Sequence, residues 1–295
     1  MRVGRVGIGG FGWNVSVLLL VTASAMAQKV PARAGAADNG QADAVKALLA
    51  ESPTSVMETL IGRERESAIH RNMYVYVSSE RSERTGGKLW TERVVECPAG
   101  HVRKLMAIDG VALNAEQEAV ERGRLAQVLK DPAPFLKEQQ DRMKDELHAR
   151  QMVQLLDKAF LFDNMRQEGE DVRIDFVPDP KYQPQSIEER VLHGMSGTVT
   201  IDPRTVRLKQ IEARLPQDVS IGFGILATVR AGTHFLSERG PVESGEWKTQ
   251  VIDTHVDGRA LFFKTLSKNE HAVHEQFERV ANDLTLEQAV ARAEQ

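Results

Sequence analysis

Apolar residues recur at helical spacing between Asp43 and Arg71, where they cluster every three or four positions. Pro53 divides this stretch, and Ser52 or Thr54 can cap the part that follows it. The pattern predicts two short helices, one on each side of the proline. Their apolar positions are Val45, Leu48, Leu49, Val56, Met57, Leu60 and Ile61.

The apolar period then changes to two, which is typical of β-strands. Apart from Met73, residues 73–77 are aromatic or β-branched, and residues 89–95 form a second segment rich in such residues. Gly86-Gly87 lies between these segments and predicts the turn of a hairpin. A third strand is predicted over 101–108, because Asp109-Gly110 supplies another turn signal after it.

From Asn114 to Leu161 the chain returns to helical spacing and becomes rich in charge. Pro132 and Pro134 interrupt it, so we expect a helix of about 15 residues, a kink and a helix of about 25. A broad apolar stripe on the second helix is more often core than ligand surface. Methionine nevertheless suits a surface that adapts to varied apolar partners. The stripe comprises Leu136, Met143, Leu147, Met152, Leu155, Leu156 and Phe160.

The rest of the chain is predicted to consist mainly of strands joined by tight turns. One short helix is expected at 187–193 and a polar, helical tail at 285–294. Strands that follow one another in this way pair as antiparallel neighbours. We therefore predict an α+β fold with a curved antiparallel sheet of nine or ten strands, an open or half-closed β-barrel covered by helices. The remaining strands are expected at 172–177, 197–203, 206–215, 219–229, 233–238, 246–256 and 259–265.

The first 27 residues have the pattern of a secretory signal peptide. Arg2 and Arg5 precede an apolar segment at 15–23, and Ala25-Met26-Ala27 forms a site for cleavage after its last residue. The alternative is an uncleaved membrane anchor, since residues 6–28 carry no charge and are long enough to span a bilayer. The cleavage site and the glycines in this segment favour removal. A periplasmic or secreted protein is therefore expected.

Cleavage leaves 268 residues, of which 28–42 form a polar leader that we expect to be disordered. The region 43–284 is predicted to be one domain with a helical insert at 114–157, followed by a polar tail at 285–295. No cysteine stands directly after the apolar segment, at the cleavage site, which excludes a lipid-anchored lipoprotein. No later segment approaches the length of a transmembrane helix. We therefore expect a soluble protein of the cell envelope.

Charge and cysteine content narrow the range of functions. Without residues 1–27 the chain has 36 basic and 42 acidic residues, and this balance argues against nucleic acid as a partner. The single cysteine, Cys97, allows no disulfide within the chain, so an exported fold must be stabilised by its core. Cys97 could act as a nucleophile, but no histidine-paired context surrounds it. A semi-buried position in a strand is favoured.

Two groups of residues are candidates for catalysis. His271 and His274 are three positions apart and could bind one metal ion if they lay on a helix. They do not form an HExxH motif, and the spacing indicates no third ligand. Acidic residues between 171 and 189 could work in pairs, but they lie at turns or on the outward face of a strand. Since motifs for nucleophiles and phosphate loops are absent, binding is favoured over catalysis and no cofactor is predicted.

Gly222 and Gly224 alternate with Ile221, Phe223 and Ile225, so one face of this segment is bulky and the other nearly bare. A bare face permits close backbone approach, strong bending or a cavity. In a curved sheet covered by helices, an apolar cavity is a usual place for a ligand. The alternative is that a helix or loop packs on the glycines, and the sequence leaves both interpretations open.

The segment 197–212, GTVTIDPRTVRLKQIE, resembles a hairpin of the LolA/LolB-like periplasmic lipoprotein carriers. The signal peptide, the leading helices and the Tyr74-Val75-Tyr76 strand are similar to the same superfamily, and the chain resembles a branch of bacterial envelope proteins of this shape. The likeness covers roughly residues 45–265 through short motifs. The insert at 114–157 is longer and more charged than the lid segments of the carriers, and no ligand-contacting arginine can be assigned.

Such carriers are half-closed barrels whose concave apolar face, lidded by helices, takes acyl chains. The resemblance therefore implies that the protein binds a lipid or an acylated lipoprotein, with other envelope proteins as partners. Two alternatives remain: an interaction protein of the same fold with a filled core, and a metal-dependent hydrolase that uses His271 and His274. The residues expected to line the ligand cavity are Tyr74, Tyr76, Trp90, Phe176, Ile221, Phe223, Ile225, Phe262 and Phe263.

Overall fold

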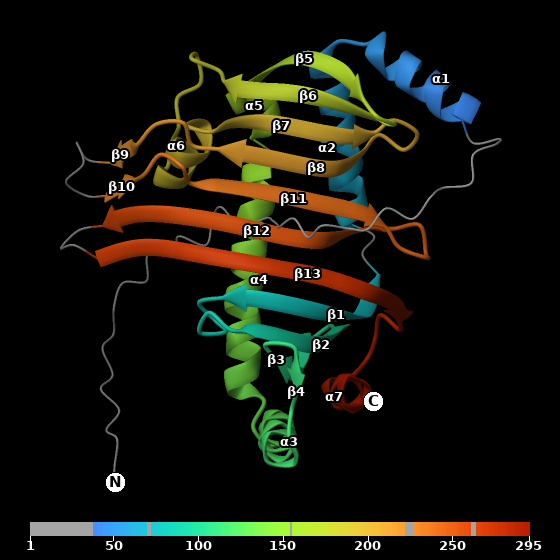
Figure 1. Ribbon diagram of the computed structural model, residues 1–295, viewed down its shortest axis with the longest axis vertical. Coiled ribbons are helices and arrows are strands. Elements are labelled where there is room, and N and C mark those ends of the chain that lie inside the picture. The colour runs from blue at the N-terminus through green and yellow to red at the C-terminus, as the bar shows by residue number, and fades with distance from the viewer. Residues whose placement is uncertain (1–37, 70–71, 154, 222–226, 261–263) are drawn as a thin grey trace.

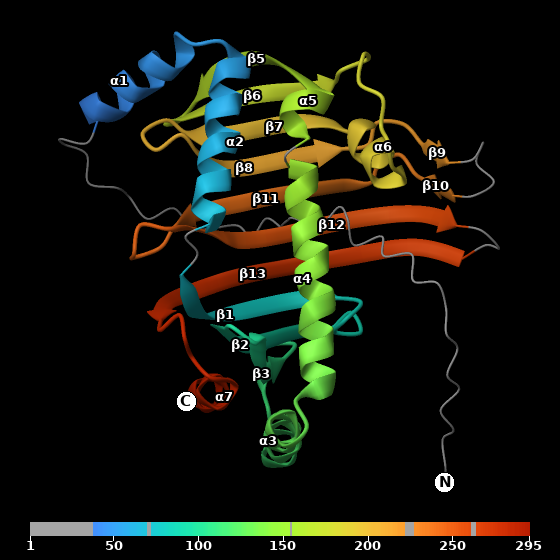
Figure 2. The same ribbon diagram turned by 180° about the vertical axis from the view of Figure 1, so that it is seen from behind.

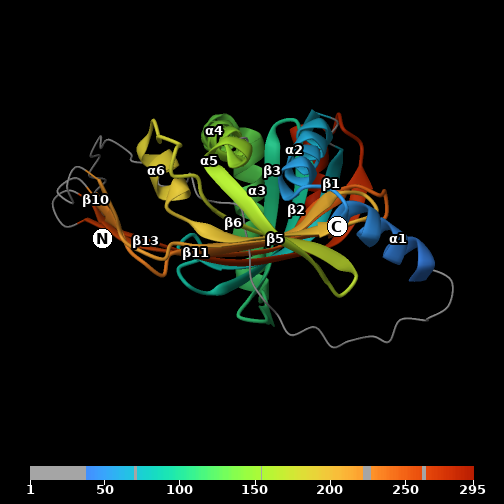
Figure 3. The same cartoon turned by 90° about the horizontal axis from the view of Figure 1, so that it is seen from above.

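The computed structural model describes residues 38–69, 72–153, 155–221, 227–260 and 264–295. These residues form an α+β fold in which one large, curved antiparallel sheet has helices on its concave side (Figures 1, 2 and 3). The predicted fold class is confirmed at this level. The described strands number 13, against the nine or ten predicted, and they form a curved sheet that is not closed into a barrel.

Two helices lead the domain, as predicted. They are α1 (Asp38–Leu49) and α2 (Pro53–Ile69), and Pro53 begins α2 at a position where its missing N–H costs no helical hydrogen bond. α1 starts inside the segment that was expected to be disordered, so that expectation is wrong from Asp38 onward. Glu64 of α2 accepts hydrogen bonds from two arginines of the sheet, Arg207 and Arg239, which attaches the helix to the strands.

The next four strands form an antiparallel meander: β1 (Met73–Ser82), β2 (Leu89–Cys97), β3 (Gly100–Ile108) and β4 (Val111–Ala112). The turn between β1 and β2 contains two glycines in the left-handed conformation, which confirms the predicted hairpin. β1 continues to Ser82, whereas the sequence predicts its end at position 77. The extension is rich in serine and charged residues, which are typical of loops.

Helices α3 (Ala115–Lys130), α4 (Ala133–Val153) and α5 (Leu156–Ala159) follow, with the predicted break between α3 and α4. Asn114 caps α3, because its side chain accepts a hydrogen bond from the backbone N–H of Gln117. The Gln117 side chain accepts in turn from the backbone N–H of Asn114. This reciprocal capping box fixes where α3 begins.

The apolar stripe predicted for the second helix of this segment is only partly buried. Leu136 and Met143 are 38% and 52% exposed, whereas Leu156 and Phe160 at its far end are buried. α4 crosses the sheet over strands whose facing side chains are largely polar, as described below. The middle of the helix therefore contacts little apolar surface, and some of its apolar side chains remain exposed.

The second half of the chain supplies the rest of the sheet, and the predicted helix at 187–193 is confirmed. The hairpin predicted over 197–215 is also confirmed. The elements are β5 (Phe160–Glu168), β6 (Asp171–Pro178), α6 (Ile187–His193), β7 (Ser196–Asp202), β8 (Arg207–Arg214), β9 (Val219–Ile221), β10 (Ala227–Val229), β11 (His234–Pro241), β12 (Trp247–Ala260), β13 (Lys264–Val280) and α7 (Leu286–Glu294).

The alternating segment at 219–229 is not one strand, as the sequence predicts. β9 and β10 pair with each other, with Ile221 opposite Ala227, so the chain reverses direction between them. An alternating pattern determines which side chains share a face, but it does not record a reversal of the chain. Gly222 and Gly224, with the bare face inferred for them, lie outside the described residues.

β13 differs most from expectation. The sequence predicts a last strand at 259–265, whereas β12 ends at Ala260 and a strand of 17 residues runs from Lys264 to Val280. Polar and charged residues occupy both faces of much of β13, so no clean alternation marks it. It pairs with β12 on one side and β1 on the other, and thereby joins the N-terminal meander to the rest of the sheet.

The strand order is β4-β3-β2-β1-β13-β12-β11-β8-β7-β6-β5, with β9 and β10 attached beside β12. Neighbours in this order are mostly neighbours in the chain, as the predicted meander requires. Three pairings depart from it: β1 meets the last strand, β8 meets β11, and β10 meets β12. The edges are β4 and β5, which lie far apart in Figure 1.

Two apolar clusters stabilise the two ends of the sheet. The larger one lies beneath α2 and α5 over β6, β7 and β8, and includes Ile174, Phe176 and Val199. The smaller one lies on the opposite face of β1, β2 and β3, where Leu125 of α3 and Val290 of α7 are buried. α7 coincides with the helical tail predicted at 285–294, and its buried residues Ala289, Val290 and Ala293 attach it to the domain.

α4 runs between these two regions and crosses the concave side of the sheet over β1, β13 and β12 (Figure 2). Its first turns are held by Phe135, which packs against the smaller apolar cluster, and by the buried Gln139. The Gln139 side chain accepts a hydrogen bond of 3.0 Å from the backbone N–H of His101. The helix is thus fixed to β3 at its start, and the strand face beneath its middle contains the candidate site.

Candidate functional site

The candidate site is the strand face beneath α4, where buried polar side chains lie beside a small apolar cluster of Tyr74, Tyr76 and Val94. Ser78 of β1 lies opposite Glu92 of β2 and His274 of β13, and residues opposite each other in antiparallel strands share a face. Glu80 and Ser82 follow Ser78 on that same face, because side chains alternate along a strand. Ser78, Glu80, Ser82 and Glu92 are all buried.

Ion pairs connect the carboxylates of this face. Arg84 donates to both oxygens of Glu80, at 3.1 and 2.5 Å, and to both oxygens of Glu92, at 3.1 and 2.5 Å. Arg103 of β3 donates to Glu92 at 2.9 Å and lies 3.7 Å from Glu80. The Ser82 hydroxyl donates to Glu80 at 2.5 Å. The Glu80–Arg84–Glu92–Arg103 network therefore satisfies both buried carboxylates with charge-assisted hydrogen bonds.

The network changes the ionisation of its members. Burial alone would raise the pKa of Glu80, but hydrogen bonds from Arg84 and Ser82 outweigh it and lower that pKa to about 2. Burial would lower the pKa of Arg84, but its hydrogen bonds to the two glutamates raise it. The two groups hold their charges at any pH near neutrality.

A third arginine reaches the same face from the helix above it. Burial lowers the pKa of Arg142 of α4, and the positive charge of Arg103 acts in the same direction. The negative charge of Glu138, which is exposed one turn earlier on α4, acts on Arg142 in the opposite direction. Arg142 thus lies within electrostatic range of Arg84 and Arg103, the two arginines that pair with Glu80 and Glu92.

Several buried polar atoms on this face have no hydrogen-bond partner among the described residues: Ser78 Oγ, Trp90 Nε1, Arg103 Nε and Thr254 Oγ1. Leaving such a group unpaired costs about 1–3 kcal/mol, so proteins rarely bury several of them together. Two of the four, Trp90 Nε1 and Arg103 Nε, can only donate. Hydrogen-bond donors are therefore left over on this face after its own acceptors are paired.

The predicted ligand residues Tyr74 and Tyr76 lie on the same side of β1 as this network. Tyr76 stacks on Phe277 with 5.0 Å between ring centroids, and Tyr74 meets the edge of the same ring at 6.2 Å. The Lys248 ammonium lies 4.0 Å from the centroid of the Tyr74 ring. Trp90 lies farther along, beneath the Arg84 guanidinium at 5.4 Å. The structure thus brings three of the nine predicted residues to one polar and aromatic face.

Phe176 lies elsewhere, in the larger apolar cluster. It is 2% exposed and packs edge-on against Phe160 with 5.2 Å between ring centroids. It is therefore a core residue beneath α2 and α5, separate from the face beneath α4. Ile221 belongs to β9, and its side chain is outside the described part; Phe223, Ile225, Phe262 and Phe263 lie outside the described residues altogether.

His271 and His274 do not converge on one metal site, as a helical spacing would have allowed. His271 and His274 are on a strand, so a separation of three positions places them on opposite faces of the sheet. His271 Nδ1 lies 3.9 Å from Asp253, whereas His274 Nδ1 lies 3.3 Å from the carbonyl oxygen of Thr249. Within the described residues, no three His, Cys, Asp or Glu side chains converge as metal ligands.

Cys97 is buried at the end of β2 and donates a hydrogen bond to the carbonyl oxygen of Gly100 at 3.3 Å. Burial raises the pKa of its thiol, which disfavours the thiolate needed for nucleophilic attack. This agrees with the strand position predicted for it. In the part of the chain that is described, no helix is long and apolar enough to cross a membrane.

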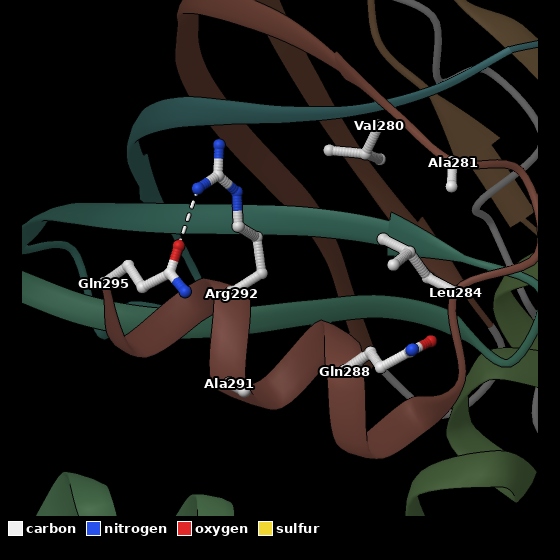
Figure 4. Close-up of a pocket in the computed structure, with 7 residues that line it drawn as sticks. All are labelled: Val280, Ala281, Leu284, Gln288, Ala291, Arg292 and Gln295. Carbon is white, nitrogen blue, oxygen red and sulfur yellow. Dashed lines mark hydrogen bonds between the residues drawn. The ribbon is translucent and has the colours of Figure 1, made fainter.

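Two shallow depressions lie on the surface, away from the face beneath α4. One, of about 440 Å³, lies between α7 and the end of β13 and is lined by Val280, Leu284, Ala291 and Arg292 among others (Figure 4). The other, of about 380 Å³, lies beside α1 and includes Val45, Leu49 and Gln167. Neither contains a predicted ligand residue or a buried charged network.

The sequence gives no direct sign of the network, although part of it was recoverable. Tyr74 and Tyr76 begin an alternation that continues as Ser78, Glu80 and Ser82, so a longer β1 would have placed these polar groups on the aromatic face. Arg84, Arg103 and Arg142 come from a turn, another strand and a helix, and only the folded chain brings them together.

The fold and the site define a class: an α+β protein with an open, curved antiparallel sheet and a buried arginine–glutamate network beneath a crossing helix. Comparison with protein-family models, with curated proteins and with solved structures gives no match. The function must therefore be inferred from the geometry and from the resemblance in the sequence.

Proposed function

We propose that the protein is an exported, non-enzymatic binding protein that takes a lipid, or the acyl chains of a lipoprotein, on the strand face beneath α4. The observation that carries this proposal is the set of buried, unpartnered polar atoms on that face, beside the aromatic side chains of Tyr74 and Tyr76. A core that serves stability alone pairs its buried polar groups. A face that receives an amphiphile leaves some of them for the ligand.

The way α4 is held supports a role as a lid. Its first turns are fixed by Phe135 and Gln139, and just beyond its end Leu155 and Leu156 pack against the larger apolar cluster. Between these points the helix presents Arg142 to the polar strand face. A helix fixed at its two ends above such a face can admit a ligand by a small outward movement of its middle.

The energetics fit reversible transfer. Burying acyl surface stabilises a complex by roughly 25 cal/mol per Å², so a long chain gains several kcal/mol from a partly apolar groove. The free energy needed to displace α4 opposes that gain, so the bound lipid can still be released. The resemblance to the LolA/LolB-like carriers, whose helices lid a concave sheet, points to the same mode of action.

A second function is supported by a different observation. The apolar cluster beneath α2 and α5 is filled, and it contains Phe176, one of the residues predicted to line a cavity. An interaction protein of the envelope, with no small ligand, would have such an interior throughout. The two functions differ in whether the purified protein contains lipid.

Native mass spectrometry after gentle extraction from the exporting cell tests the proposal. We expect adducts with the masses of lipids on the wild-type protein, and their loss in Tyr76→Ser. Tyr182→Ser is the matched control, because Tyr182 bonds to Glu189 beside α6, away from α4. Both variants are first checked for folding by circular dichroism. A folded wild-type protein without adducts, which also takes up no fatty acid added in solution, contradicts the carrier function and favours the filled interaction protein.

A further inference from the structure

We infer that the face beneath α4 contains a binding site for a phosphate group, held by Arg103 and Arg142 with the Trp90 indole and the Ser78 hydroxyl. This inference rests on the proposed function when the phosphate belongs to a lipid headgroup, and it names the polar part of that ligand. The same chemistry would also bind free inorganic phosphate. The test below separates the two sources.

The first argument for a phosphate site is the balance of charges on this face. Arg84 uses its three guanidinium nitrogens on Glu80 and Glu92, and Arg103 contributes a further bond to Glu92. The two carboxylates are therefore occupied by two arginines. Arg142 brings a third positive charge, and the carboxylate that acts on it, that of Glu138, is exposed on α4 outside this face. The enclosed face has a surplus of one positive charge, which an anion would balance.

The second argument is the set of buried polar atoms that have no hydrogen-bond partner among the described residues. Arg103 Nε and Trp90 Nε1 can only donate hydrogen bonds, and the Ser78 hydroxyl can donate as well. Ser78 is fully buried, at 0% exposure, so water does not satisfy its hydroxyl from outside. A ligand that completes this set must present several acceptor oxygens and negative charge. A metal cation is excluded, since it would meet donors and positive charge.

The geometry favours phosphate among the anions. The donors come from β1, β2, β3 and α4, so they approach from the floor of the site, from its sides and from above. A phosphate group presents oxygens in tetrahedral directions and matches such an arrangement, while guanidinium groups recognise it with paired N–H bonds. A carboxylate presents its two oxygens in one plane and would leave part of the set unpaired.

The site can be reached from one side. The side chain of Arg84, in the turn between β1 and β2, is 33% exposed, that of Arg103 is 16% exposed, and Ser78 lies at the floor. Exposure thus decreases from the turn inward. A headgroup would enter beside Arg84 and Trp90, and its acyl chains would extend along the aromatic residues Tyr76 and Phe277.

The decisive variant is Arg142→Gln, because Arg142 takes part in none of the ion pairs that hold the described strands together. Lys137→Gln is the matched control: it removes the same charge from α4, but Lys137 is exposed and pairs with Asp141 on the same helix. Ser78→Ala is a second variant, which removes one hydroxyl at the floor without changing charge. Circular dichroism and thermal unfolding establish that each variant is folded before binding is measured.

Binding of the full-length mature protein is measured at about 150 mM salt, where surface charges are screened over roughly 8 Å. The three probes are inorganic phosphate, vesicles of phosphatidylglycerol, and vesicles of an uncharged galactolipid with similar acyl chains. We expect phosphatidylglycerol to bind at least about tenfold more tightly than the galactolipid, as one charge-assisted contact of about 1.5 kcal/mol would give. Arg142→Gln should lose that preference, Ser78→Ala should weaken it several-fold, and Lys137→Gln should keep it. Binding of inorganic phosphate that Arg142→Gln abolishes also supports the site, with free phosphate as the source.

The outcomes distinguish the two proposals. Equal binding of both vesicles, unchanged in Arg142→Gln, overturns the phosphate site and leaves the carrier function standing. Binding of inorganic phosphate without binding of either vesicle supports the site and contradicts the carrier function. If folded protein binds none of the three probes, both proposals fail.

Discussion

The rings of Tyr76 and His274 lie 5.1 Å apart on the neighbouring strands β1 and β13, beneath α4. This contact places His274 on the buried polar face. Burial lowers the pKa of His274 to about 4, and the nearby positive charge of Arg103 acts in the same direction. The residue is therefore neutral at physiological pH, and its protonation is linked to folding.

The first prediction concerns acid stability. The pKa of His274 is about 4 in the folded protein against 6.5 when unperturbed, so the unfolded chain binds the extra proton first as the pH falls. Stability from this residue is fully present above pH 6.5 and is lost progressively between pH 6.5 and 4, by on the order of 1 kcal/mol per pH unit. Urea denaturation at several pH values across this window measures the slope.

His274→Gln should flatten this dependence, because the side chain no longer titrates. His271→Gln is the control, since His271 lies on the other face and is more exposed. If both variants keep the wild-type slope, another group controls acid stability and His274 is not held neutral by its surroundings.

The second prediction concerns the arginine–glutamate network. Glu92→Gln removes a charge that Arg84 and Arg103 share, and it leaves both guanidinium groups beside a neutral amide. Breaking a buried pair costs several kcal/mol, and the partial exposure of Arg84 reduces this to about 2 kcal/mol. Glu168→Gln, which breaks the exposed pair with Arg173, should cost less than about 1 kcal/mol. Chemical denaturation compares the two, and equal losses would mean that the network adds no stability beyond a surface pair.

These two predictions depend on features that the sequence only partly reveals. Helical spacing and the Pro53 break were enough to predict α1 and α2, and the glycine pair was enough for the β1–β2 turn. These signals are local, because each depends on neighbours in the chain. The α+β class and the curved antiparallel sheet follow from them.

The features that failed depend on contacts distant in sequence. β13 was missed because its His, Glu and Lys residues suit a surface loop, and only pairing with β1 and β12 makes them a strand. Glu80 and Glu92 suit a solvated face until Arg84 and Arg103 neutralise them there. A charge is buried only where a partner neutralises it, and the local sequence pattern does not contain that partner. The sequence alone therefore identifies only the aromatic residues of the candidate site.

The third prediction concerns export. Cleavage after Ala27 yields a mature chain of 268 residues that begins with Gln28. Intact-mass measurement and N-terminal sequencing of the exported protein check this directly. Ala27→Phe should block cleavage, because the peptidase accepts only small residues there, and the precursor should accumulate in the membrane fraction.

Met26→Phe is the matched control for this prediction. It introduces the same bulky side chain one position earlier, between the two small residues that the cleavage site requires, where a large residue is already present. Cleavage of this variant should therefore proceed as in the wild-type protein. A wild-type chain that keeps its first 27 residues would instead support the membrane anchor.

The last prediction uses two glycines with opposite surroundings. A Cβ atom on Gly197 of β7 would lie 1.9 Å from the carbonyl oxygen of Glu212 on β8, and a backbone atom in a paired strand cannot move aside. Gly197→Ala should therefore separate the two strands over the larger apolar cluster and cost at least about 3 kcal/mol, the upper range for strained core substitutions.

Gly123→Ala is the matched substitution, and it is expected to stabilise the fold instead of destabilising it. Nothing lies within 4 Å of the added methyl group on α3, and alanine favours a helix by about 1 kcal/mol over glycine. Thermal unfolding should thus show a lower midpoint for Gly197→Ala and a raised one for Gly123→Ala. A requirement for glycine at position 197 thus reflects the close packing of β7 against β8. Two variants with the same midpoint would mean that β7 and β8 do not approach as closely as their register indicates.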